Sequence, residues 1–210
     1  MQSDRRSDIA PTSPPRGYRP DWERDFVLTD GSVAHVRPIR PDDYEGLIAF
    51  HEALSPDTVR LRFFSPHPHL LPAEASHFTT VDYHDRVALV ALVGSTMVAV
   101  GRYERLSGTT SAEVAFVVAD AYQGRGLGTL LLEELADAGR SCGLDRFVAD
   151  VLAENHRMVQ VFRDAGFLEH HHYDQGVIRV DLSIEPGDGY REAHARRSLS
   201  RRVLPGPPDP

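Results

Sequence analysis

The chain has 210 residues, of which 41% are hydrophobic and 26% charged, and this balance predicts one globular domain with a full core. No apolar run approaches the roughly 18 residues that a membrane-spanning helix needs, and the first 20 residues lack the apolar segment of a signal peptide. The net charge of −8 disfavours a nucleic-acid partner and modestly favours a cationic substrate. Cys142 is the only cysteine, which excludes an internal disulfide and favours a cytoplasmic location.

Both ends of the chain differ in composition from its centre. Residues 1–24 are rich in proline, serine and arginine without an apolar period, and this pattern predicts a disordered tail. Residues 186–210 are again arginine- and proline-rich and are predicted to form a second solvated tail. The folded domain is therefore expected over residues 25–185.

The first half of the domain begins with a predicted hairpin. Phe26–Thr29 and Ser32–Ile39 flank the turn pair Asp30-Gly31. A helix of about a dozen residues is expected from Pro41, and Ser55-Pro56 marks the start of another helix with serine as its N-cap. A short helix near residues 73–78 follows, and then come three apolar strands, predicted at Val87–Val93, Thr96–Tyr103 and Ala112–Val118.

The second half alternates between helices and strands. A glycine-rich turn leads into a helix with leucines at spacings of three and four, on which Glu133, Glu134 and Asp137 are expected to face water. Cys142-Gly143 ends this helix. The remaining predicted elements are a strand, a helix and a final hairpin, at Phe147–Leu152, Asn155–Ala165, Phe167–His172 and Gly176–Ile184.

The turn at Gln123–Thr129 is the most informative segment. A strand that feeds a glycine-rich turn and then a helix N-terminus presents backbone N–H groups to an anion, and this arrangement predicts a pyrophosphate site. The lysine of a nucleotide-binding P-loop is absent after Gly128, and the glycine spacing does not fit the dinucleotide-binding fingerprint.

The turn resembles the acetyl-CoA motif of the GNAT acyltransferase superfamily, Gln/Arg-x-x-Gly-x-Gly/Ala, which is matched by Gln123, Gly126 and Gly128. Asn155–Phe167 resembles the second signature of that superfamily, and residues 37–65 are similar to the start of bacterial protein lysine acetyltransferases. The sensor domains often fused to that subgroup have no counterpart here. The resemblance implies an α+β, three-layer α/β/α fold whose mixed, mostly antiparallel sheet is splayed at the CoA site.

The resemblance also implies which residues bind acetyl-CoA. The backbone of one strand would pair with the pantetheine amides, the glycine turn would hold the pyrophosphate, and the following helix would contact the cofactor arm. The residues carried over by position are Phe116, Val117, Val118, Gln123, Gly124, Arg125, Gly126, Leu127, Gly128, Thr129, Asn155 and Met158. Plain N-capping is an alternative role for Asn155 that is compatible with cofactor contact.

Glu113 is the predicted catalytic base. A lysine amine has a pKa of about 10.4 and must lose a proton before it attacks. Glu113 is the only carboxylate of its apolar strand and matches the glutamate that serves as base in the lysine-acetylating subgroup. Phe162 stands where many GNAT enzymes have a tyrosine that protonates the thiolate. Tyr122 and Tyr173 are alternative donors, but nothing in the sequence directs either toward the sulfur.

Other candidate residues have simpler interpretations. In the run His170-His171-His172, only the first and third can share a strand face, and no acid or cysteine lies at ligand spacing, so no metal is predicted. His67 and His69 are interpreted as ordinary loop residues, and Cys142 as a buried apolar side chain rather than a nucleophile.

The sequence therefore predicts an acetyl-CoA-dependent N-acetyltransferase that transfers acetyl directly to a primary amine in a ternary complex. A protein lysine is the preferred acceptor, and a small-molecule amine is the first alternative. A non-catalytic acyl-CoA-binding module and a nucleotide-binding protein remain further alternatives. Neither the identity of the amine nor the oligomeric state follows from the sequence.

Overall fold

The computed structural model describes residues 14–187, 191 and 192. In these residues the strands form one sheet in the order β1-β2-β3-β4-β5-β6-β8-β7. The strands are β1 (Arg24–Val27), β2 (Val33–Pro38), β3 (Arg86–Val93), β4 (Thr96–Arg105), β5 (Ser111–Val118), β6 (Arg146–Leu152), β7 (Leu168–Asp174) and β8 (Val177–Ser183). The α-helices are α1 (Tyr44–Glu52), α2 (Pro56–Phe63), α3 (Pro72–Thr79), α4 (Leu127–Ser141) and α5 (His156–Ala165), and the 3₁₀ turns are η1 (Pro20–Trp22), η2 (Pro41–Asp43) and η3 (Asp120–Tyr122).

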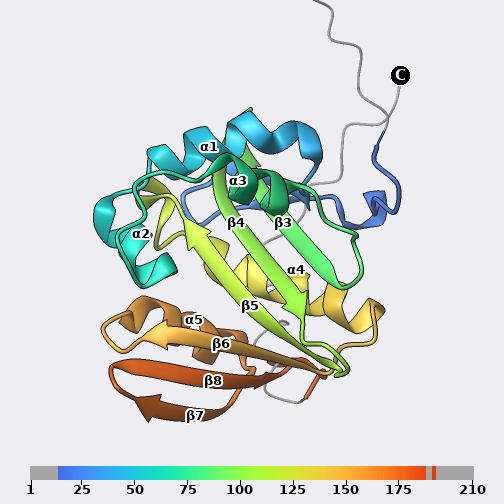
Figure 1. The fold of residues 1–210 in the computed structure, drawn as a ribbon. Helices are drawn as coiled ribbons and strands as arrows, with labels where there is room; N and C mark the ends of the chain where they lie inside the picture. Colours follow the sequence, from blue (N-terminus) through green and yellow to red (C-terminus); the bar gives the residue numbers. More distant parts are fainter. Residues whose placement is uncertain (1–13, 188–190, 193–210) are drawn as a thin grey trace, which may run out of the picture.

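The sheet is mixed, and only the pair β5–β6 is parallel among the strands described. Helices cover both faces: α1, α2 and α3 lie over one face, and α4 and α5 contribute to the core on the other (Figure 1). The three-layer α+β fold predicted from the sequence is confirmed, and each predicted α-helix and β-strand is present.

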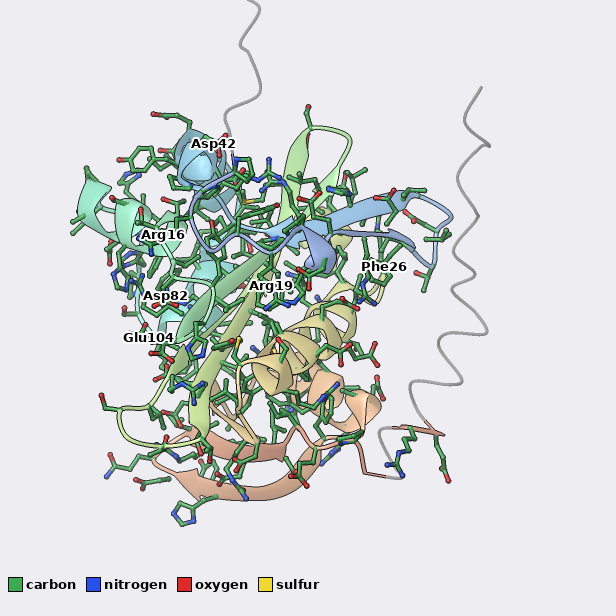
Figure 2. The ribbon with its side chains drawn as sticks, turned by 90° about the vertical axis from the view of Figure 1, so that its right-hand side faces the viewer. Arg16, Arg19, Phe26, Asp42, Asp82 and Glu104 are labelled. Atoms are coloured by element: carbon green, nitrogen blue, oxygen red, sulfur yellow. The ribbon has the colours of Figure 1, made fainter. Side chains whose placement is uncertain are left out.

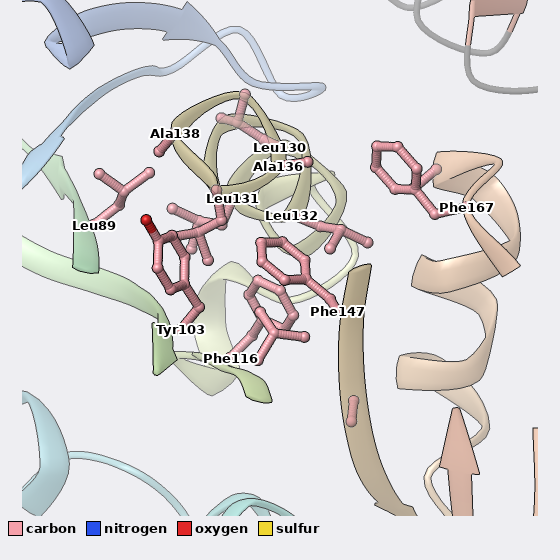
Figure 3. Close-up of a cluster of buried hydrophobic side chains, with 14 of the residues drawn as sticks. Leu89, Tyr103, Phe116, Leu130, Leu131, Leu132, Ala136, Ala138, Phe147 and Phe167 are labelled. Carbon is pink, nitrogen blue, oxygen red and sulfur yellow. The ribbon is translucent and has the colours of Figure 1, made fainter. Parts of the chain in front are cut away.

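The larger core lies between α4 and the sheet. The leucines of α4 interdigitate with aromatic rings from β4, β5 and β6, as Figure 3 shows for Tyr103, Phe116 and Phe147 around Leu131. Leu131 and Phe147 are fully buried, and burial of a side chain of this size contributes about 1.5–3 kcal/mol. This apolar packing fixes α4 on the sheet and so fixes the position of the glycine turn at its N-terminus.

The prediction that Glu133 and Glu134 face water is wrong. Glu133 is only 3% exposed, and the side chain of Glu134 is 11% exposed and lies 3.8 Å from Arg24 of β1. The β1–β2 hairpin widens the sheet, and α5 packs on α4 as well, so α4 is covered over more of its circumference than a single apolar stripe indicates.

The structured part of the chain begins earlier than predicted. Tyr18 packs edge-on against Tyr83 with ring centroids 5.6 Å apart, and its hydroxyl donates to Glu23 at 2.6 Å. Figure 2 shows the segment that carries Arg16 and Arg19 against the body of the domain. The predicted boundary at residue 24 is therefore too late. Residues 1–13 and all but a few of residues 186–210 lie outside the described part of the structure.

Candidate active site

The parallel strands β5 and β6 separate after a short paired stretch. Their register runs only from Ser111 opposite Arg146 to Glu113 opposite Val148. Beyond these residues the strands diverge, and Figure 1 shows their starts side by side and their arrowheads apart. Since β6 turns away, the rest of β5 keeps an edge whose backbone groups are not paired with β6.

Strand alternation decides which residues face this gap. The N–H of Ala119 donates to the Val98 carbonyl at 2.8 Å, so the backbone groups of Val117, two residues earlier, also point toward β4. The backbone groups of Phe116 and Val118 then face the gap. The sequence predicted that the backbone of Val117 would pair with pantetheine, but this backbone belongs to the β4 ladder. The Val117 side chain lines a pocket on the face covered by α1–α3.

The glycine turn has the geometry of an anion site. Gly124 and Gly126 have φ values of +75° and +85°, which L-residues with a Cβ rarely adopt. Among the residues that the structure describes, no side chain caps helix α4 and none in its first turn is acidic, so the positive end of its dipole favours an anion. A Cβ at Gly124 would meet nothing within 4 Å, which leaves room beyond the turn.

Three other residues of this motif contribute to packing inside the domain. A Cβ on Gly128 would lie 3.2 Å from the side chain of Val161, so this glycine allows α5 to approach α4. Leu127 and Thr129 are buried at 1% and 7% exposure. Their contribution to an anion site is therefore confined to the backbone N–H groups of the first turn.

The polar side chains of the turn are already engaged. The amide nitrogen of Gln123 donates to the Thr58 hydroxyl at 3.1 Å and to the Val118 carbonyl at 3.2 Å, and its oxygen accepts from Arg157. Gln123 thus ties α2 and α5 to the end of β5.

The Arg125 guanidinium is engaged by three groups outside the glycine turn. It pairs with Asp30 in the β1–β2 turn and donates to the Ala121 carbonyl at 2.7 Å. Its guanidinium also lies over the Tyr122 ring, 4.6 Å from the centroid.

Helix α5 begins beside the gap. The Asn155 side chain accepts from the Met158 N–H at 3.1 Å and caps the helix, so its capping role is present. Met158 packs against the larger core between α4 and the sheet. Phe162 is buried at 1% exposure and its ring stands edge-on to Phe116 with centroids 6.5 Å apart; a phenyl ring supplies no proton.

Glu113 lies at the point where the strands part. It is the last residue of β5 that is registered with β6, and its side chain is exposed. On the face covered by α1–α3 it is two residues before Ala115 and directly opposite Glu104 of β4, which Figure 2 labels. The Glu113 carboxylate also interacts electrostatically with Arg62 and Arg102.

A pocket opens on this same face, between the sheet and α1–α3. Its cavity volume is about 40 Å³, and it is partly open to solvent. Most of its wall is apolar, and Ala115 and Val117 of β5 form part of it. Three of its lining residues are ionisable and were not singled out from the sequence: His51, Arg62 and Arg102.

His51 fixes the wall of the pocket. It is 3% exposed, and its Nε2 donates to the His67 carbonyl at 2.7 Å. The His67 ring stacks on Phe63 at 4.4 Å, and its Nε2 lies 3.2 Å from Glu74 of α3. These contacts connect α1, α2, α3 and the loop between α2 and α3. Its position four residues after Leu47 in the apolar stripe of α1 could have indicated that His51 is buried.

The remaining sequence candidates do not gather at this site. Cys142 is buried at the far end of α4, with its sulfur 3.8 Å from the Tyr83 carbonyl. Tyr173 is 63% exposed on β7. The side chains of His170 and His171 lie outside the described part of the structure, and the residues that are described contain no group of three possible metal ligands. None of the helices described here has the length and apolar character needed to cross a membrane.

Comparison with known proteins agrees with this geometry. The model of the acetyltransferase (GNAT) family matches residues 47–167. Acetyltransferase Pat of Mycolicibacterium smegmatis is 32% identical over 163 residues, which is 75% of this chain and 48% of that protein, so the chain spans about half the length of this relative. Acetyltransferase PA5475 of Pseudomonas aeruginosa is 32% identical over 145 residues, or 67% of this chain and 78% of that protein.

A solved structure, the GNAT domain of S. lividans PAT, is 41% identical to this chain. It superposes with a TM-score of 0.76 and covers 79% of this chain and 99% of its own. The family match covers more than half of the chain and includes β5, the glycine turn and α5. The chain therefore belongs to the GNAT acetyltransferase family, the N-acetyltransferases that use acetyl-CoA as acyl donor.

Proposed function

We propose that this chain transfers the acetyl group of acetyl-CoA directly to a primary amine, with a protein lysine as acceptor and Glu113 as the base. The observation that carries the proposal is that β5 has two open surfaces. Part of its edge is not paired with β6, where the donor would lie, and its face toward α1–α3 lines a pocket, where an acceptor would lie.

The residues present fit the acyl donor. The backbone groups of Phe116 and the N–H of Val118 face the gap and can pair with amides of an extended arm, as an added strand would. The first N–H groups of α4 and the left-handed turn at Gly124 and Gly126 suit a pyrophosphate. When bound, the donor supplies a thioester whose carbonyl carbon is open to attack by a nucleophile.

The position of Glu113 supports its proposed role as the base. Its side chain is on the acceptor face, where the strands part, and it is exposed to an incoming amine or a bridging water. In the reaction the ammonium first gives one proton to the Glu113 carboxylate, and the neutral nitrogen then forms a bond to the acetyl carbon. The carbon–sulfur bond breaks as the nitrogen releases its second proton. A neutral attacking nitrogen is required because an ammonium has no lone pair.

The sulfur leaves without help from the second signature. Phe162 occupies the position where a donor tyrosine would lie, and its buried ring packs on Phe116. Tyr122 lies beneath the Arg125 guanidinium, and Tyr173 is exposed on the outer hairpin. We infer that water, or the proton released from the amine, neutralises the thiolate.

The test is an acetyl-transfer assay with acetyl-CoA and a panel of amines. Release of the CoA thiol is followed together with the mass of the acceptor, which separates acetyl transfer from hydrolysis. Lysine peptides, free amino acids and a polyamine distinguish a protein acceptor from a small one. A parallel thermal-shift series with acetyl-CoA, CoA, ATP and NAD should show stabilisation by the CoA compounds. Stabilisation by ATP or NAD but not by CoA would overturn the proposal.

A further inference from the structure

Two arginine side chains converge on the pocket from different elements. Arg62 comes from the last turn of α2, and Arg102 from the middle of β4. Arg102 is the cross-strand partner of Ala115, so it lies on the floor of the pocket next to β5. Both side chains are half-buried, and the rest of the lining is almost entirely apolar.

Neither guanidinium has a hydrogen-bond or ion-pair partner among the residues that the structure describes. Their close contacts are with rings: Arg62 lies 5.0 Å from the centroid of Phe63, and Arg102 lies 4.0 Å from that of Phe78. The other arginines near this face are paired differently, as when Arg86 donates to the His77 carbonyl at 2.5 Å.

Nearby carboxylates compensate these two charges only in part. Burial lowers the pKa of Arg62, the nearby charge of Arg102 lowers it further, and Glu113 raises it. Burial likewise lowers the pKa of Arg102, against the opposing influence of Glu104 and Glu113. Two like charges that are partly removed from water cost free energy unless a negative group compensates them.

We propose that Arg62 and Arg102 bind a carboxylate carried by the acyl acceptor, so that the substrate is an amine with an acidic group close to its reactive nitrogen. The inference rests on the proposed function and narrows its substrate class. The guanidinium fork donates two parallel hydrogen bonds to a carboxylate, which fixes orientation as well as position.

The spacing along β5 is suitable for such a substrate. Arg102 is level with Ala115, and Glu113 lies two residues earlier on the same face, about 7 Å along the strand. A carboxylate held by Arg102 would therefore leave an amine of the same molecule within reach of Glu113. The paired cations also disfavour an ammonium there, which lowers the cost of the neutral amine that the reaction needs.

Matched acceptors that differ in one charge provide the test. Leucine and leucinamide form the small-molecule pair, and two lysine peptides with glutamate or glutamine beside the lysine form the peptide pair. For the 210-residue chain we expect kcat/KM to be about 10- to 100-fold higher for the acidic member of at least one pair. The pair that shows the preference identifies whether the carboxylate belongs to a free amino acid or to a peptide. A polyamine should be a poor acceptor.

Substitutions of Arg62 and Arg102 test whether these two side chains cause the preference for the acidic acceptor. In Arg102→Gln and Arg62→Gln the ratio of acid to amide should fall toward one, and Arg102→Lys should give an intermediate ratio because charge remains without the fork. Arg179→Gln is the matched control, since Arg179 is exposed on β8 at 3.9 Å from Asp150. It should keep the wild-type ratio. Thermal melts confirm that each variant is folded.

Equal or better turnover of the uncharged member in both pairs would overturn the inference, as would a preference that persists in both glutamine variants. If no amine is acetylated, the proposed function fails. Calorimetry of the same compounds with the CoA-bound protein then tests whether the pocket binds a carboxylate. Binding of the acid at least tenfold tighter than the amide, lost in Arg102→Gln, supports the carboxylate site. Equal or undetectable binding rejects it.

Discussion

The two faces of the sheet are packed in different ways. On the face under α4, large apolar side chains fill the space, and those of Leu131, Phe147 and Phe162 are at most 1% exposed. On the face under α1–α3, the core is smaller and is interrupted by a pocket that contains His51, Arg62 and Arg102. The first face holds the glycine turn in place, and the second contains a pocket with two arginines, where we propose that the acceptor binds. A dense core supplies rigidity, whereas specificity needs a cavity with polar groups.

The largest expected effect is on the acceptor face. Glu113→Gln should lower turnover about 10²- to 10⁴-fold while acetyl-CoA affinity stays within about twofold, because the amide cannot accept the proton. The defect should shrink as the pH rises from 6 toward 10, since free amine becomes more abundant near the amine pKa of about 10.4. Steady-state kinetics across this range provide the measurement.

Glu104 gives a matched control for this substitution. It is exposed and directly opposite Glu113 on the same face. Glu104→Gln should change turnover less than about threefold. A similar loss in both variants, or a loss in Glu113→Gln that is the same at every pH, would show that the local negative charge matters and that Glu113 is not the base.

On the donor side, Gly126→Val should weaken acetyl-CoA binding by about 100-fold. The new side chain would occupy the anion's place, and the φ of +85° is strained for a β-branched residue. Gly143→Val is the control, since Gly143 has a φ of +77° at the other end of α4 and nothing within 4 Å of its Cβ position. Calorimetry should show that Gly143→Val keeps its affinity for acetyl-CoA despite a similar loss of thermal stability. Equal losses of affinity would mean that backbone strain alone explains the effect.

Arg125→Ala should have a smaller effect on the donor side, less than about fivefold on acetyl-CoA affinity, and added salt should reduce it further. The guanidinium is paired with Asp30 and lies over Tyr122, so it is not directed at the turn's amides. Asp30→Asn should leave affinity unchanged or improve it, because Arg125 is then released toward the phosphates. Calorimetry at low and high salt tests both variants. A loss larger than that of Gly126→Val would mean that the site depends on Arg125 more than on the backbone.

The smallest effect on either site is expected at the N-terminus. Deletion of residues 1–13 should leave the free energy of unfolding and acetyl-CoA affinity unchanged. Deletion of residues 1–23 removes the Tyr18–Tyr83 ring contact and the pairing of Arg40 with Glu23 at 2.9 Å. It should lower the free energy of unfolding by about 1–2 kcal/mol without changing affinity. Denaturant titration compares the two, and equal stability would place the start of the stable domain after residue 23.

The proposed donor site could be derived from the sequence because its residues are close together in the chain. A strand, a glycine turn and a helix N-terminus follow one another within about twenty residues, and their chemistry depends on backbone conformations that glycine selects. The predicted cap at Asn155 and the leucine stripe of α4 were likewise visible as short-range patterns. Even here the engagement of Arg125 by Asp30, 95 positions away in the chain, could not be predicted.

The pocket proposed for the acceptor became visible only in the folded chain. His51, Arg62 and Arg102 come from α1, α2 and β4, and each reads in the sequence as an ordinary polar residue of its element. Strand register places Arg102 beside Ala115 and turns the backbone of Val117 away from the gap, and helix packing determines that the pocket stays open. The sequence alone determined the family, the elements and the donor motif, because these depend on local conformation and periodicity. The tertiary structure decided where the side chains of distant segments meet, because register and packing are set by the whole core.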